Sequence, residues 1–422
     1  MEPLHVVISP NIYLRIRAIR ESPLLPGLNK IYIPDNPRPL DLSSVLFLVS
    51  GTTLNMVQFG SNAISDRQFF APFLSLLYIK SPGLAHLALH GVVNVSLGPI
   101  YRFTKLQSLE LKLRNPHLEP QLLQKLGEMG HLLDLVIDTG TSMDFHTSSI
   151  QSHTVPPCTG YPNFRKLRKL QILGTASLIN RILNEMKGLP KLTILKIEEM
   201  WDGWKSRATE SSWKCSFEAI STFSAVEDIE ITHALDRPKG QYVLSASCLS
   251  PLFRLDNMMS LVINLKNAVF SGSDDDIRLL AGAFPKLKKL VLPGPPPHSS
   301  TGRTLACLYH LSRECPDLRE LKIYLSFNIS DNLNAIKKVA RPIIRNYRHP
   351  LEKLCIKSEF GQPLPVQLIQ VARFLDFIFP NLSNLGTDKS NMTEVANWAE
   401  IQECCLALQD ARMYASASAS DI

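Results

Sequence analysis

One unit occurs twice in succession between Ser271 and Tyr324, and this repetition constrains the fold more than any other feature of the sequence. Each copy has an amphipathic run, a break at Phe284-Pro285 or Cys315-Pro316, and a Leu-x-x-Leu-x-Leu/Ile motif. The motif comprises Leu287, Leu290 and Leu292, and again, starting 31 residues later, Leu318, Leu321 and Ile323. A unit of helix, break and short strand can bury its apolar face only by stacking on its neighbours, so a repeat array is predicted.

The motif recurs about a dozen times when any large aliphatic side chain is allowed. The copies begin at Leu28, Leu54, Leu84, Leu106, Leu132, Leu167, Leu192, Val226, Met258, Leu287, Leu318, Leu351 and Leu382. A run with helical period precedes most of them. Alternating helices and short strands require parallel strands with helices on the other face. The sequence therefore predicts an α/β leucine-rich-repeat solenoid, a curved horseshoe with parallel strands on the concave face and helices on the convex face.

The chain divides into four predicted parts. Residues 1–23 form an N-terminal lead-in or cap, 24–392 the irregular solenoid, 393–412 a C-terminal capping helix and 413–422 a disordered tail. The capping helix is predicted because Trp398, Ile401, Cys405 and Leu408 share one helix face. Residues 139–163, 198–217 and 294–302 interrupt the repeat rhythm and are predicted to be surface loops.

Composition and charge exclude several classes of function. A hydrophobic content of 45% with 20% charged residues is that of an ordinary folded protein. The net charge of +7 is spread along the chain, whereas nucleic-acid binding requires a concentrated basic face. We find no secretory signal and no apolar run long enough to cross a membrane. We therefore expect a cytoplasmic or nuclear protein that binds neither nucleic acid nor membrane.

Motifs for catalysis or cofactor binding are absent from the sequence. It contains no GxSxG, GxxxxGK, GxGxxG or HExxH. The acidic run Asp274 to Asp276 suits a helix N-terminus better than a metal loop, because the later ligands of a calcium site are missing. The cysteines form no CxxC pair and are interpreted as small buried hydrophobic residues. We predict no enzymatic activity, no cofactor and no metal site.

Between the buried aliphatic positions of each motif, polar residues point to the concave face. An acidic step at Asp228 and Glu230 is followed by a basic run over the last three full repeats. The candidate protein-binding residues of that run are Lys288, Lys289, Arg319, Lys322, Lys353 and Lys357. One interpretation is a groove that attracts an acidic peptide or phosphopeptide. The alternative is that these cations only solvate an exposed sheet face.

Three tryptophans gather in one predicted insertion. Trp201, Trp204 and Trp213 are candidate binding anchors, because tryptophan is enriched among the residues that dominate protein interfaces. The alternative is that they fold back and cover apolar surface at the edge of the solenoid. Their spacing does not distinguish the two interpretations.

The segment from Leu249 to Leu325 resembles a fungal family of F-box and leucine-rich-repeat-like proteins. The resemblance lies in the runs LSPLFRLDNMMSLVINL, SDDDIRLLAGAFPKLKKLVL and TLACLYHLSRECPDLRELKI, and in the ending FLDFIFPNLSNL with WAEIQECCLALQDAR. It implies a substrate-recognition subunit of a cullin-type ubiquitin ligase, whose F-box binds the ligase adaptor. Residues 1–23 are too short for an F-box, so we expect this chain to lack one. The alternative is a stand-alone binding protein with no link to ubiquitin.

Overall fold

The computed structural model describes a subset of the chain. The described residues are 15, 19, 27–33, 54–60, 67–92, 96–114, 122–139, 164–200, 209–233, 242–266, 268–294, 303–325, 329–339, 349–357, 364–386 and 392–420. The chain divides into two compact units. Unit 1 comprises residues 1–192 and 198–207, and unit 2 comprises residues 193–197 and 208–422.

Unit 1 contains six parallel strands that lie side by side in sequence order. They are β1 (Lys30–Ile33), β2 (Met56–Phe59), β3 (His86–Val92), β4 (Ser108–Arg114), β5 (Asp134–Asp138) and β6 (Lys169–Gly174). Helical segments connect most of the strands. They are α3 (Arg67–Lys80), the 3-10 helix η1 (Gly98–Arg102), α4 (Leu122–Gly127) and α5 (Ala176–Glu185). Strand β7 (Ile194–Glu199) lies at the boundary of the two units.

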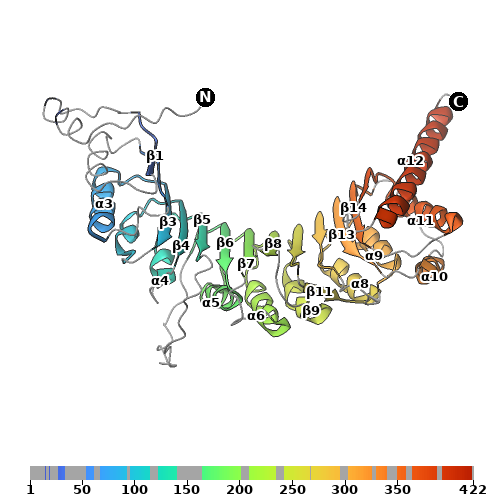
Figure 1. The fold of residues 1–422 in the computed structure, drawn as a ribbon, viewed down its shortest axis with the longest axis horizontal. Helices are drawn as coiled ribbons and strands as arrows, with labels where there is room; N and C mark the ends of the chain where they lie inside the picture. The colour runs from blue at the N-terminus through green and yellow to red at the C-terminus, as the bar shows by residue number, and fades with distance from the viewer. Residues whose placement is uncertain are drawn as a thin grey trace. The chain divides into compact units, whose positions relative to one another are not determined.

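Unit 2 continues the same pattern. Its strands are β8 (Asp228–His233), β10 (Ser260–Asn264), β12 (Lys289–Val291), β13 (Glu320–Tyr324), β14 (Lys353–Lys357) and β15 (Asn384–Gly386), again parallel and in order. Its helices are α6 (Glu210–Ile220), α7 (Ala246–Leu249), η2 (Ser250–Arg254), α8 (Asp274–Ala283), α9 (Ala306–Glu314), α10 (Ile329–Val339), α11 (Pro365–Ile378) and α12 (Met392–Ser420). Within each unit the strands of the large sheet lie along one side and most helices along the other, whereas α12 lies at the C-terminal end (Figure 1).

Each predicted motif forms a strand of these sheets, which confirms the α/β leucine-rich-repeat solenoid. Strand pairing is in register, so that Leu290 lies opposite Leu261 on one side and Leu321 on the other. All three are fully buried. Because side chains alternate along a strand, the same pairing places every second residue on the open face of the sheet.

The structure differs from the sequence prediction at three places. Helix α6 spans residues 210–220, so it includes the end of the predicted loop 198–217 and continues past it. Thr209 caps its N-terminus. Strands β9 (Tyr242–Ser245) and β11 (Ala268–Ser271) form a second, two-stranded parallel sheet that was not predicted. Helix α12 continues to Ser420, so most of the predicted tail 413–422 is helical. The predicted lead-in and the loop 139–163 lie almost wholly outside the described residues.

Two ionisable side chains are buried between repeats of unit 2. Arg303 donates a hydrogen bond from Nη2 to the Phe270 carbonyl oxygen at 3.0 Å, and its guanidinium carbon lies 5.0 Å from the Phe270 ring centre. Burial lowers the pKa of Arg303 to about 10. His349 lies 3.1 Å through Nε2 from the Cys315 carbonyl oxygen, and its Nδ1 accepts from the Leu351 amide at 3.3 Å. Both side chains therefore tie one repeat to another.

Candidate functional site

The predicted basic residues gather on the open face of β12, β13 and β14. Strand pairing places Lys289 opposite Glu320, and Glu320 opposite Lys353. The next outward position along β13 is Lys322, which lies between Val291 and Cys355. Opposite residues on neighbouring strands lie about 5 Å apart. The register of the sheet thus brings these side chains into one surface, which we call the basic sheet face.

A second row of charged residues precedes the strands. Arg319 donates its amide to the Lys288 carbonyl oxygen at 2.8 Å, and Glu352 donates to the Arg319 carbonyl oxygen at 3.0 Å. The three residues therefore lie side by side, and all three are exposed. They extend the basic sheet face beyond the ends of its strands.

Lys357 occupies the last position of β14, where its backbone pairs with Tyr324. Its side chain lies outside what the structure describes. The described part of the basic sheet face therefore has five cationic side chains, Lys288, Lys289, Arg319, Lys322 and Lys353, and two carboxylates, Glu320 and Glu352. Its net charge is positive.

One carboxylate neutralises part of this charge. Lys289 Nζ lies 3.0 Å from Glu320 Oε2, with both side chains 40% exposed. The acidic step on β8 is also partly neutralised, since Lys196 Nζ lies 2.5 Å from Glu230 Oε2. Ion pairs at this exposure contribute little stability. Their main effect is to neutralise Lys289 and Lys196 among the outward-facing cations of the sheet.

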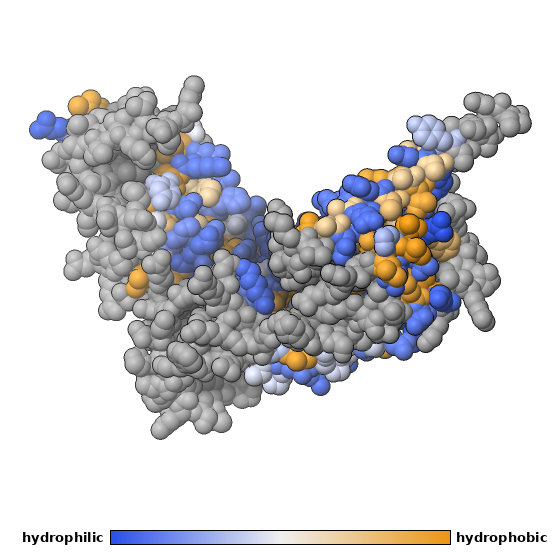
Figure 2. All heavy atoms as spheres, turned by 45° about the vertical axis from the view of Figure 1, so that its right-hand side comes forward, coloured by the Kyte–Doolittle hydropathy of each residue, from blue (hydrophilic) through white to orange (hydrophobic). Residues whose placement is uncertain are grey.

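In Figure 2, hydrophilic and hydrophobic residues are interspersed over the described surface at the right, where unit 2 lies.

The structure separates the three tryptophans. Trp201 and Trp204 lie outside the described residues. Trp213 is part of α6 and is 2% exposed; its Nε1 donates to the Tyr242 hydroxyl at 2.9 Å, and its ring stacks on Phe217. The interpretation of Trp213 as an exposed binding anchor is therefore wrong, because the side chain is in the core. Two signals in the sequence indicated this helix. One is Thr209, three residues before Ser212, as in a capping box, and the other is the helical spacing of Trp213, Phe217 and Ile220.

Unit 1 has a charged cluster that sequence reasoning missed. Glu110 Oε1 on β4 lies 3.1 Å from His90 Nε2 on β3 and 2.6 Å from Lys112 Nζ two residues along its own strand. Burial raises the pKa of Glu110, but the hydrogen bonds and charges of Lys112 and His90 outweigh it, so that the pKa is lowered overall. The strand register that brings His90 and Glu110 together is not visible in either segment alone.

The interpretation of the cysteines as small buried side chains holds for part of them: among the described cysteines, Cys215 is exposed and Cys355 and Cys404 are half-buried. Cys248, Cys307, Cys315 and Cys405 are buried free thiols. Burial raises the pKa of the Cys315 thiol to about 12. A thiol that stays protonated is a weak nucleophile and a poor metal ligand. Asp274 to Asp276 form the first turn of α8, where the predicted N-terminal role is confirmed: Ser273 Oγ accepts from the Asp276 amide at 3.3 Å.

Comparisons with known proteins add little to this geometry. No protein-family model and no curated protein sequence matches the chain. A solved structure of a leucine-rich-repeat protein from Leptospira interrogans aligns at 11% identity, over 85% of this chain and 93% of that chain, with a TM-score of 0.29. In the part of the chain that the structure describes, no cluster of His, Cys, Asp and Glu is arranged to hold a metal ion. None of the described helices has the length and apolar composition to cross a membrane.

Proposed function

We propose that this chain is a protein-binding scaffold and that the basic sheet face binds an acidic segment of its partner. The observation that supports this is the gathering of five cationic side chains on, and directly before, three consecutive strands of one open sheet. Only Glu320 and Glu352 oppose them on the described surface. A positively charged concentration of this kind accelerates encounter with an acidic partner and selects against basic ones.

The test is a charge reversal in the middle of the face. We expect the double variant Arg319→Glu, Lys353→Glu to weaken binding of a fluorescein-labelled peptide of alternating Glu and Ser by about tenfold or more, measured by fluorescence anisotropy. Arg313→Glu, an exposed cation on α9, is the matched control and should leave affinity unchanged. Equal binding by all three proteins, or no binding by the unaltered chain, would contradict the proposal.

We further propose that the chain acts as a substrate receptor related to the F-box subunits of cullin-type ubiquitin ligases. Support for this step comes only from the resemblance of Leu249 to Leu325 and of the C-terminal run to that family. In this role the chain performs no chemistry; it holds a target near a ubiquitin carrier that the ligase supplies. The alternative, a stand-alone binding protein, uses the same face without a ligase.

Affinity purification distinguishes the two roles. The tagged chain is isolated from a fungal lysate, probed for the ligase adaptor and analysed by mass spectrometry. Adaptor recovered in amounts comparable to the tagged chain supports the ligase role. Other proteins enriched without adaptor would contradict it and favour the stand-alone scaffold.

A further inference from the structure

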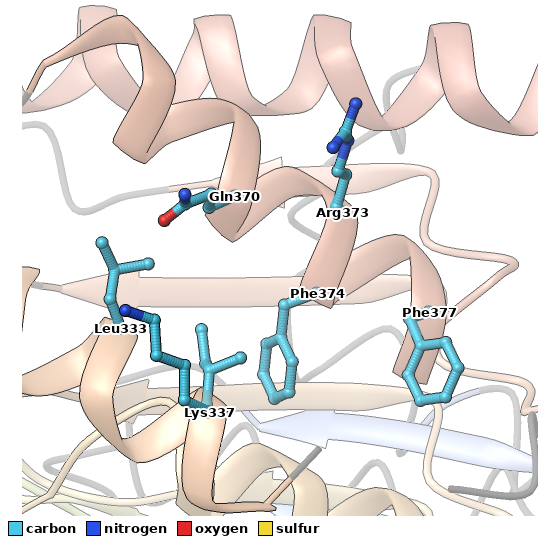
Figure 3. A pocket seen from close by; sticks show the side chains of 7 residues that line it. Leu333, Lys337, Gln370, Arg373, Phe374 and Phe377 are labelled. Atoms are coloured by element: carbon cyan, nitrogen blue, oxygen red, sulfur yellow. The ribbon is translucent and has the colours of Figure 1, made fainter. Parts of the chain in front are cut away.

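A pocket of about 470 Å³ lies on the helix side of unit 2, between α10 and α11. Leu333, Ile336, Phe374 and Phe377 supply its apolar lining, and Lys337, Gln370 and Arg373 its polar groups. Figure 3 shows Leu333 and Lys337 at one side, Arg373 at another and Phe374 between them. An apolar floor with a few polar groups at its edge is typical of a binding site.

The apolar surface continues from this pocket along α11. Val366 and Ile369 are 64% and 41% exposed, and each lies four residues before a pocket residue, Gln370 and Arg373 respectively. Residues at this spacing are neighbours on a helix surface. The stripe of α11 from Val366 to Phe377 is therefore about 17 Å long, or three helical turns. Val366 and Ile369 are exposed at one end, Phe377 is half-buried at the other, and Gln370 and Arg373 lie between them. We call the pocket and this stripe together the helix-side groove.

The groove presents two cations, Lys337 on α10 and Arg373 on α11. Among the ion pairs of the described residues, none involves Lys337 or Arg373. Both side chains are exposed. In the view of Figure 3, Lys337 lies to the left of Phe374 and Arg373 points upward, away from Phe374, so the two cations lie at different edges of the pocket. The complementary ligand has an apolar stripe with carboxylates beside it.

We propose that the helix-side groove binds an acidic amphipathic helix of a partner protein. Such a helix places apolar residues at positions i, i+3, i+4 and i+7 along one face and can fill a groove of three turns. Glu or Asp next to that face meets Lys337 and Arg373. This site is separate from the basic sheet face, because it requires apolar contacts and uses none of the same residues.

The test uses a synthetic probe with the full chain. The probe is a fluorescein-labelled 15-residue peptide with Leu at i, i+3, i+4, i+7 and i+11, Glu at the flanking positions and Ala elsewhere. A matched peptide carries Lys in place of Glu. We expect the acidic peptide to bind, and the basic peptide to bind at least about tenfold more weakly. Failure of the acidic peptide to bind, or equal binding of the two, would overturn the proposal.

Variants locate the bound peptide. Lys337→Glu with Arg373→Glu, and separately Phe377→Ser, should each weaken the acidic peptide about tenfold. Arg313→Glu, an exposed cation on α9 outside both surfaces, should leave its affinity unchanged. Weaker binding after Arg319→Glu with Lys353→Glu, but not after the groove variants, would show that the peptide binds the sheet face and would overturn the groove while leaving the proposed function intact. Circular dichroism of each variant confirms that the fold is retained.

Discussion

The basic sheet face and the helix-side groove of unit 2 both present cations, but they differ in whether a neighbouring carboxylate neutralises these cations. On the sheet, Glu320 lies directly between Lys289 and Lys353, and Lys289 pairs with it. On the helix side, Lys337 and Arg373 belong to different helices and form no ion pair among the described residues. Paired strands lie about 5 Å apart, whereas packed helices lie 8–10 Å apart. The strand ladder therefore neutralises part of its own charge, whereas Lys337 and Arg373 lie outside the ion pairs of the described residues; the packed helices α11 and α12 do form such a pair, between Asp376 and Arg412.

The largest effect is expected from removing the ladder that supports the sheet face. Leu321 is fully buried in β13, between Leu290 and Leu354. Leu321→Ala leaves a cavity and should lower the free energy of unfolding by about 3 kcal/mol. Urea unfolding followed by circular dichroism measures this loss. Lys353→Ala, on the exposed side of the neighbouring strand, should change stability by less than about 0.5 kcal/mol. Equal losses in the two variants would show that β13 does not support the core.

A decrease in stability of intermediate size is expected when the pH is lowered, because of His349 in the repeat that carries Lys353. Burial lowers the pKa of His349, and the hydrogen bond to the Cys315 carbonyl and the charge of Asp317 offset this only in part. The unfolded chain, with a histidine pKa of about 6.5, then binds more protons than the folded chain. The free energy of unfolding should therefore decrease as pH falls below about 6.5.

Urea unfolding of the unaltered chain and of His349→Gln between pH 7.5 and 5 tests this. The variant loses a buried hydrogen-bond partner and should be less stable at pH 7.5 by about 1–3 kcal/mol, with a smaller decrease toward pH 5. His310 also has a pKa lowered by burial and by Arg278, so it contributes to the same pH dependence, and His310→Gln measures that separate contribution. An unchanged pH dependence in His349→Gln would exclude His349 as the source.

The repeat motif determined most of the fold because its signal is local. Each copy of the motif supplies the buried residues of its own strand, so every copy could be placed from the sequence. At β12 these residues are Leu287, Leu290 and Leu292. The sheet β9–β11 was missed because its two four-residue strands lie outside the copies of the motif. The end of α12 was missed because ASASAS has nothing to bury, yet alanine has the highest helix propensity.

The candidate sites were less accessible to sequence reasoning. Alternation placed Lys289 and Lys322 on the open face of the sheet, but only the register shows that Glu320 pairs with Lys289. Trp213 was ambiguous because its burial depends on Tyr242, 29 residues later. The helix-side groove depends on how α10 and α11 pack, which no periodicity within either helix reveals. The side of an element on which a residue lies was predictable, whereas the contacts between residues of two elements were not.

Removing the central carboxylate should make the sheet face resemble the groove. Glu320→Gln leaves Lys289 and Lys353 without their shared neutralising group. We expect it to strengthen binding of the Glu/Ser peptide by roughly two- to fivefold in fluorescence anisotropy, because one repulsive charge is lost. Glu314→Gln, a carboxylate on α9, serves as the control and should have no effect. Weaker binding in Glu320→Gln would show that the carboxylate helps to position the cations instead.

The smallest effect concerns the ion pair itself. A double-mutant cycle of Lys289→Ala and Glu320→Ala should give a coupling of about 0.2–1 kcal/mol in the free energy of unfolding, because both groups are well exposed to solvent. The same cycle on Lys337 and Arg373 should give zero or a slightly repulsive value, since neither belongs to an ion pair among the described residues. Raising the salt concentration to 1 M should reduce the first coupling and leave the second near zero. Equal couplings at both places would show that the sheet register does not neutralise charge, and the difference between the two surfaces would then have to arise from exposure alone.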